Sequence, residues 1–130
     1  MVNVLITSDS RYPVNRKVIK RAVADVLIRE GIENLNAEVS VLVCGFRKMN
    51  ELSKKYLGDG REHEVLSFPL ESGPKVPVNN SDDLLRLGDV VISWPKVLEL
   101  AAFENVYVDE KLAFLVSHGV EHLLGKHHEE

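Results

Sequence analysis

The sequence predicts a single α+β domain over residues 1–130, with a small mixed β-sheet and helices packed around it. Three observations lead to this prediction. Short runs rich in valine and isoleucine alternate with segments of 3.6-residue apolar periodicity, in the order β-α-β-α-β-β-α-α. A chain of 130 residues can bury one hydrophobic core without disulfides. No internal repeat, low-complexity tract or linker interrupts the pattern.

The first half of the chain is expected to form strand, helix and strand. Val2–Thr7 is a short apolar run typical of a strand. A helix is predicted from Pro13 to about Glu30, because proline favours the first helical turn and Gly31 favours its end. Ala37–Phe46 is apolar on both faces of the predicted strand, which indicates a position inside the sheet.

A second helix is predicted over Arg47–Leu57, ended by the glycines of 58–60. Its expected inward residues are Met49, Leu52, Ser53 and Tyr56. The next strand, Glu64–Leu70, ends at its proline, and Ser72–Arg86 has the composition of a long loop.

The last strand and two helices follow without a linker. Leu87–Ser93 is predicted to be a strand, and Ser93 with the proline two residues later predicts a helix to about Phe103. Asp109 is the expected N-cap of the final helix, whose apolar face is shared with two histidines.

The composition indicates a cytoplasmic protein. The single cysteine, Cys44, excludes an internal disulfide and is expected to be a small core residue. The start of the sequence has no basic region before a long apolar run, so no secretory signal is expected. No stretch approaches the roughly 20 apolar residues of a membrane span, so no membrane partner is expected.

Positive charge is concentrated in the first half of the chain. Residues 1–60 carry ten Lys/Arg and seven Asp/Glu, whereas residues 61–130 carry six and thirteen. The net charge of −4 argues against indiscriminate binding to nucleic acid. Because the excess of positive charge lies in residues 1–60, a polyanion would bind mainly to the first half of the chain. Five basic residues surround the start of the first helix, namely Arg11, Arg16, Lys17, Lys20 and Arg21. They form either a phosphate track or an ordinary solvated face.

Four of the five histidines lie in the last thirteen residues, which is the strongest functional signal in the sequence. His118 and His122 are four residues apart, so on a helix both imidazoles project from one face. Gly125 favours a left-handed turn that ends the helix and brings back either His127 or His128, of which His128 has the better spacing. The pattern H-x3-H-x5-H predicts one zinc ion on three imidazoles with an open fourth position. A polar tail remains the alternative.

Two zinc-peptidase patterns fit less well. In H-E-x-x-H enzymes a glutamate follows the first histidine, but Gly119 stands there. The inverted pattern H-x-x-E-H matches His118–His122, yet its third ligand is a distant downstream glutamate and only eight residues follow His122. Glu121, roughly 60° around the helix from His118, is a candidate to assist a metal-bound water or is an exposed helical residue. Gly119 also indicates a close approach by a backbone or a substrate.

Three motifs resemble the YbeY family of rRNA-maturation endoribonucleases. They are H-G-V-E-H-L-L-G-K-H-H at His118–His128, V-L-S-F-P at Val65–Pro69 and L-G-D-V-V-I-S at Leu87–Ser93. The resemblance runs from about residue 36 onward and implies a zincin-like α+β fold, with zinc held by His118, His122 and His128. It also implies a role in ribosome biogenesis through hydrolytic cleavage of single-stranded RNA, including processing at the 3′ end of small-subunit rRNA. The implied partners are the small ribosomal subunit with ribosomal proteins or an assembly GTPase.

The sequence departs from the family pattern near the expected phosphate site. Leu57 stands where the family has a functional arginine, and His63-Glu64 replace Thr-Asp. Lys126 and His127 replace tyrosine and aspartate before the third ligand. Leucine cannot provide the bidentate phosphate contact of arginine. The candidate RNA-binding residues are therefore Arg16, Lys20, Lys55 and Arg61, and His118 with Glu121 are the candidate catalytic residues. The alternative function is an RNA-binding ribosome-assembly factor with a mainly structural zinc.

Overall fold

The computed structural model describes residues 2–32, 34–70 and 84–125, and within them the chain forms four strands and four helices in the predicted order. None of the helices in these ranges is long and apolar enough to cross a membrane. The elements are β1 (Val2–Ser8), α1 (Arg16–Arg29), β2 (Ala37–Cys44), α2 (Phe46–Leu57), β3 (Val65–Pro69), β4 (Leu85–Ser93), α3 (Trp94–Glu104) and α4 (Val108–Leu123).

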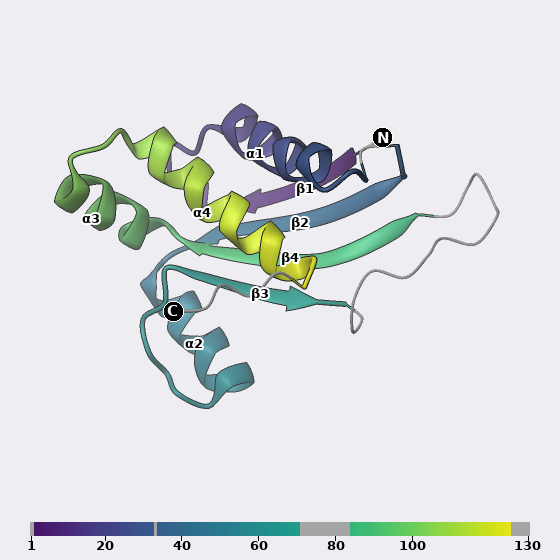
Figure 1. Ribbon diagram of the computed structural model, residues 1–130. Coiled ribbons are helices and arrows are strands. Elements are labelled where there is room, and N and C mark those ends of the chain that lie inside the picture. Colours follow the sequence, from purple (N-terminus) through teal and green to yellow (C-terminus); the bar gives the residue numbers. More distant parts are fainter. Residues whose placement is uncertain (1, 33, 71–83, 126–130) are drawn as a thin grey trace.

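The four strands form one mixed sheet in the order β1-β2-β4-β3, as Figure 1 shows. β1, β2 and β4 are parallel, and β3 pairs antiparallel with β4. The predicted interior position of β2 is confirmed, because it pairs with β1 on one side and β4 on the other. Within the described residues, β3 is an edge strand that pairs only with β4. Pro69 is tolerated there because an edge strand does not need every backbone N–H for pairing.

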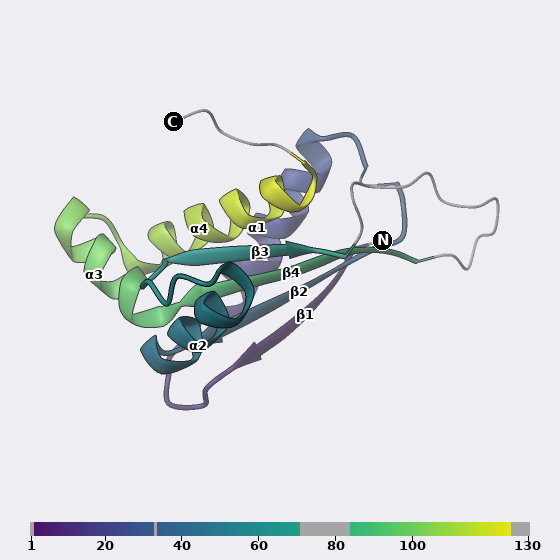
Figure 2. The same ribbon diagram turned by 90° about the horizontal axis from the view of Figure 1, so that it is seen from below.

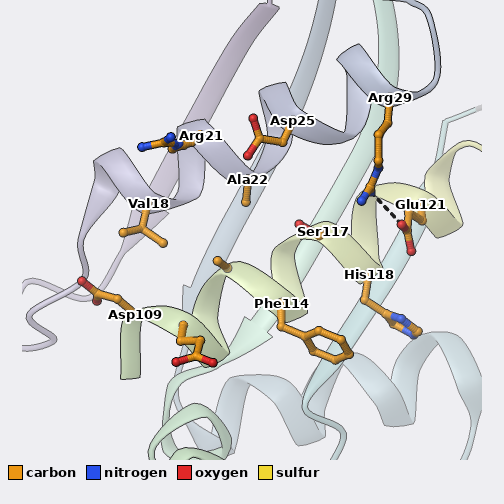
Figure 3. A pocket seen from close by; sticks show the side chains of 12 residues that line it. Val18, Arg21, Ala22, Asp25, Arg29, Asp109, Phe114, Ser117, His118 and Glu121 are labelled. Carbon is orange, nitrogen blue, oxygen red and sulfur yellow. Dashed lines mark hydrogen bonds and ion pairs between the residues drawn. The ribbon is translucent and has the colours of Figure 1, made fainter. Parts of the chain in front are cut away.

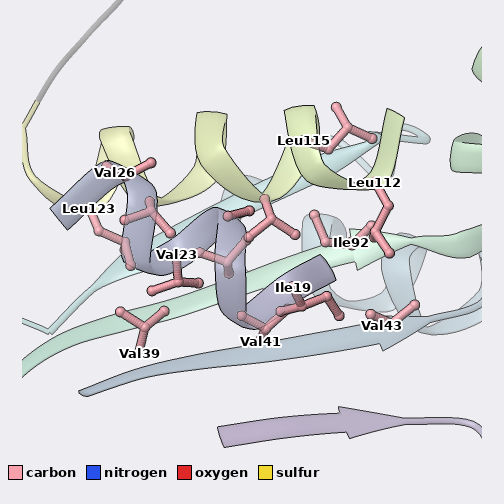
Figure 4. Packing of buried hydrophobic residues seen from close by; sticks show 14 of the residues in the cluster. Ile19, Val23, Val26, Val39, Val41, Val43, Ile92, Leu112, Leu115 and Leu123 are labelled. Atoms are coloured by element: carbon pink, nitrogen blue, oxygen red, sulfur yellow. The ribbon is translucent and has the colours of Figure 1, made fainter. Parts of the chain in front are cut away.

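Helices cover the two faces of the sheet unequally (Figure 2). α1 and α4 lie side by side on one face, and α2 lies on the other. Figure 4 shows how side chains of α1 and α4 meet those of the strands in a large core. Its buried members include Ile19, Val23, Val26, Val39, Val41, Val43, Ile92, Leu112, Leu115, Val116, Val120 and Leu123. The apolar stripes predicted for the first and last helices are thereby confirmed.

A much smaller buried cluster lies beneath α2. It consists of Cys44, Met49, Leu66 and Val91. The prediction that Met49 and Ser53 point inward is confirmed, whereas the prediction for Tyr56 is wrong. Tyr56 is 56% exposed and contacts Phe68 of β3 with ring centroids 5.1 Å apart.

β4 contains a bulge that period-two alternation does not reveal. The strand begins at Leu85, within the segment predicted to be loop, and its pairing with β2 shifts between Arg86 and Gly88. Leu87 is the extra residue, so that Leu87 and Val90 both join the large core. Gly88 has φ +138°, and a Cβ there would lie 2.3 Å from the carbonyl oxygen of Phe68. Only glycine fits that backbone approach.

Two predicted helix starts are wrong. α1 begins at Arg16 rather than Pro13, because the side chain of Asn15 accepts a hydrogen bond from the N–H of Val18. α4 begins at Val108 with Tyr107 as N-cap, so Asp109 lies in the first turn. There its carboxylate accepts from the Asn15 amide at 3.0 Å and connects the starts of α1 and α4. The predicted Ser93 cap of α3 is confirmed.

Candidate metal centre

Two of the predicted zinc ligands face the same way on α4. His118 and His122 are both half-buried, and their ring centroids are 4.6 Å apart with an interplanar angle of 44°. The neighbouring apolar residues of α4 are buried in the large core, namely Leu115, Val116, Val120 and Leu123. The helix is therefore fixed by its apolar face, and it presents the two imidazoles on an adjoining face.

Strand β3 provides the opposite wall of a cleft at these imidazoles. The cleft has a volume of about 300 Å³ and is lined by Glu64, Val65, Leu66, Ser67, Pro69, His118 and His122. The hydroxyl of Ser67 donates a hydrogen bond of 2.9 Å to the carbonyl oxygen of Gly119. This bond joins the edge strand to the turn of α4 that carries both histidines. The V-L-S-F-P motif thus builds the wall of the cleft.

Gly119 permits the close packing of α4 on the sheet. A Cβ at this position would lie 2.6 Å from Cγ1 of Val90 and 3.3 Å from the hydroxyl of Ser67. The sequence predicted that another backbone or a substrate approaches Gly119. The structure shows side chains of β3 and β4 there, so the glycine sets the distance between the histidines and the edge strand.

The donor chemistry fits zinc. His118 and His122 provide two imidazoles on one cleft, and Nε2 of His122 is shielded from solvent. The predicted third ligand, His128, and its neighbour His127 lie outside the described residues. Within the part of the chain that the structure describes, no group of three His, Cys, Asp or Glu side chains is placed to hold a metal ion. A three-ligand site therefore needs a donor such as His128.

Glu121 points away from the β3 cleft. Its carboxylate accepts a hydrogen bond of 2.8 Å from the guanidinium of Arg29 on α1, and its side chain is 21% exposed. This ion pair connects the C-terminal halves of α1 and α4. Glu121 and His122 are neighbours in sequence, so the pair also restrains the helical turn that carries the second histidine.

The four predicted RNA-binding residues do not form one surface. Arg16 and Lys20 lie on α1, whereas Lys55 lies on α2 on the other side of the sheet (Figure 2). Arg16 donates to the carbonyl oxygen of Ile6 at 3.1 Å and so holds the end of β1. The ammonium of Lys55 lies 5.2 Å from the centre of the Tyr56 ring.

Arg61 lies in an ordered loop before β3. Its N–H donates to Asp59, and this hydrogen bond is the first cause that lowers the pKa of the Asp59 carboxyl. His63 also contacts Asp59, at 3.1 Å. The carbonyl oxygen of Arg61 accepts from the buried hydroxyl of Ser53 at 2.9 Å. The backbone is thereby fixed while the Arg61 side chain is exposed, three residues before the cleft residue Glu64. Leu57, in the family's arginine position, is 51% exposed at the end of α2.

A second hollow lies between α1 and α4, on the other side of His118 from the β3 cleft (Figure 3). It has a volume of about 860 Å³, and its lining includes Arg21, Arg29, Phe114, His118 and Glu121. Arg29 and Phe114 lie beside the site but are not among the site residues that the sequence predicted. The spacing of Arg21, Asp25 and Arg29 at intervals of four, next to Val18 and Ala22, is the signal that could have placed them on this face.

Sequence comparisons with known proteins agree on one family, and a structural comparison shows a similar fold. The sequence model described as "Endoribonuclease YbeY" matches residues 6–130. A Roseiflexus castenholzii protein of that name is 34% identical over 129 residues, covering 99% of this chain and 80% of that protein. A protein of the same name from Dehalococcoides mccartyi is 30% identical over 137 residues, which cover 99% of this chain and 78% of that protein. The solution structure of a Thermotoga maritima protein is similar with a TM-score of 0.59 and 22% identity, covering 99% of this chain and 75% of that one.

Proposed function

The chain belongs to the YbeY endoribonuclease family, and on that premise we propose that it is a zinc-dependent endoribonuclease specific for single-stranded RNA. The proposed substrate is rRNA, with processing at the 3′ end of 16S rRNA and a role in ribosome biogenesis and quality control in the cytoplasm. The observation that carries the proposal is the pair His118 and His122 on one face of α4, open to the cleft at β3.

The proposed ligands are His118, His122 and His128. Zinc held by these three neutral imidazoles would supply a positive charge that favours deprotonation of water and polarisation of a phosphate oxygen. The chain's own contribution is to fix the imidazoles. The buried face of α4, the close contact at Gly119 and the hydrogen bond from Ser67 hold His118 and His122 opposite the edge strand.

Because residue 57 is a leucine, other residues of this chain must bind the phosphate groups of the RNA. Arg61 is the candidate for which the structure offers most support, because its backbone is fixed and its exposed side chain precedes the cleft. Lys55, Arg16 and Lys20 supply further positive charge that attracts RNA over a longer range. Glu121 acts in this proposal by orienting the turn of His122 through its ion pair with Arg29.

A second candidate function is supported by Leu57. An assembly factor that binds RNA with a mainly structural zinc would not need the arginine that the family has at this position. In that case RNA affinity survives without nuclease activity.

Cleavage and zinc content test the proposal together. Zinc-loaded protein is incubated with a single-stranded RNA copied from the 3′ end of 16S rRNA and with the same RNA annealed to its complement. We expect the single strand alone to be cut. Groups that merely orient a metal ligand contribute about 10–100-fold to activity. The cleavage rate of the His118→Ala protein should therefore fall by more than about 100-fold. The His122→Ala protein should lose its single zinc ion.

His63→Ala is the matched control, because His63 contacts Asp59 in the loop and does not line the cleft. It should keep its zinc. RNA binding with no cleavage under any divalent metal would support the assembly factor instead. Normal zinc content in His122→Ala would contradict the proposed metal centre.

A further inference from the structure

We propose that the hollow between α1 and α4 is a subsite for one unpaired nucleobase of the RNA, and that Phe114 is the ring on which this base stacks. The inference rests on the proposed function, because it assigns a binding position next to the proposed reaction centre. The base would belong to a nucleotide whose phosphate lies at the histidines, on the other side of His118.

Phe114 is placed one helical turn before His118 and projects to the same side of α4 (Figure 3). The two ring centroids are 6.1 Å apart and the ring planes differ by 19°. Phe114 is 58% exposed and lines the hollow. An exposed aromatic ring on a stable helix, nearly parallel to a candidate zinc ligand, has no role in the core. It can accept the face of a base that is not stacked in a duplex.

The Phe114 ring is supported by an ion pair whose ammonium is buried and whose carboxylate is exposed. The ammonium of Lys111 lies 4.6 Å from the centre of the ring, and Lys111 is only 9% exposed. Both carboxylate oxygens of Glu104 on α3 accept from this ammonium at 3.0 Å. Lys111 is not among the residues that line the hollow, whereas Phe114 is. The cation therefore holds the ring in place from outside the hollow.

The chemistry of the hollow suits a base better than a phosphate. Its apolar residues are Val18, Ala22, Ala113 and Phe114, and its charged residues are two arginines and four carboxylates. One of the arginines, Arg29, is already paired with Glu121. The excess of carboxylates repels a phosphate, whereas a nucleobase offers a flat apolar face and amino groups at its edge that donate to carboxylates.

Affinity for a short single-stranded RNA tests the inference. Fluorescence anisotropy is measured in the cold with the zinc-loaded protein, and only over the interval in which gels show that the RNA is still uncut. Base–aromatic stacking contributes about 1–3 kcal/mol, so Phe114→Leu should bind roughly 5- to 150-fold more weakly. Phe114→Trp should keep the affinity. Phe103→Leu is the matched control, because Phe103 is 87% exposed on α3 and does not line the hollow.

An abasic scan of the RNA separates stacking from an indirect structural effect. Removal of one particular base should weaken binding to the wild type and abolish the difference between wild type and Phe114→Leu. Removal of other bases should leave that difference unchanged. If Phe114→Leu binds like the wild type, or if its loss is the same for every abasic RNA, the subsite is wrong while the endoribonuclease proposal stands. If the wild type neither binds nor cuts single-stranded RNA, the proposed function fails and the subsite fails with it.

Discussion

The two faces of the sheet differ in how firmly they are built and in what they carry. Among the described residues, nineteen buried side chains form the core beneath α1 and α4, whereas four form the cluster beneath α2. The candidate ligands His118 and His122 stand on the helix of the larger core. Lys55 and Arg61 belong to the α2 side and project from exposed positions. A metal site needs ligands fixed to within a fraction of an ångström, whereas long-range attraction of RNA does not.

Truncation of one buried side chain on each face should give the largest effects and the clearest contrast. Leu123→Ala and Met49→Ala each remove a large side chain that is at most 2% exposed, and each should lower the free energy of unfolding by about 2–5 kcal/mol. Urea unfolding measures this loss. Only Leu123→Ala should also weaken zinc binding, because Leu123 adjoins His122 in the larger core. Equal loss of zinc affinity in folded Met49→Ala would show that the two faces are not independent.

Two serine hydroxyls offer a comparison at an intermediate scale. Ser67 donates to Gly119 on the α4 side, and Ser53 donates to Asn50 and Arg61 on the α2 side. Each serine-to-alanine change should lower the unfolding free energy by about 0.5–1.5 kcal/mol. The Ser67→Ala protein alone should lose zinc affinity, since its hydrogen bond restrains the turn between the histidines. Unchanged zinc affinity in Ser67→Ala would limit that hydrogen bond to a structural role.

The smallest expected effect belongs to Cys44 in the smaller cluster. Burial raises the pKa of this thiol from about 9 to about 11. The unfolded chain therefore releases the proton first, so stability is lost as the pH rises from about 9 through 11. At pH 9 the loss is roughly 0.4 kcal/mol. Unfolding curves of the wild type and Cys44→Ala at pH 7 and pH 9 measure it. Rapid reaction of the folded thiol with a disulfide reagent at pH 8 would show that the α2 face opens more readily than its packing indicates.

Much of the fold follows from local patterns along the chain. The interior position of β2 was visible in a strand apolar on both faces, and the Ser93 cap of α3 depends on residues three apart in sequence. The pair His118 and His122 was visible as helical spacing. These features depend on backbone geometry and burial, which a short segment determines by itself.

Other features depend on contacts between distant segments, which only the tertiary structure decided. The bulge at Leu87 and Gly88 depends on the backbone of β3, and the close packing at Gly119 depends on Val90. The partner of Glu121 is Arg29, 92 residues away. Sequence spacing places two imidazoles on one helix face. Which strand they face, and which aromatic ring and arginine lie beside them, is determined by how α1 and β3 pack against α4, because residues far apart in sequence become neighbours only when the core is assembled.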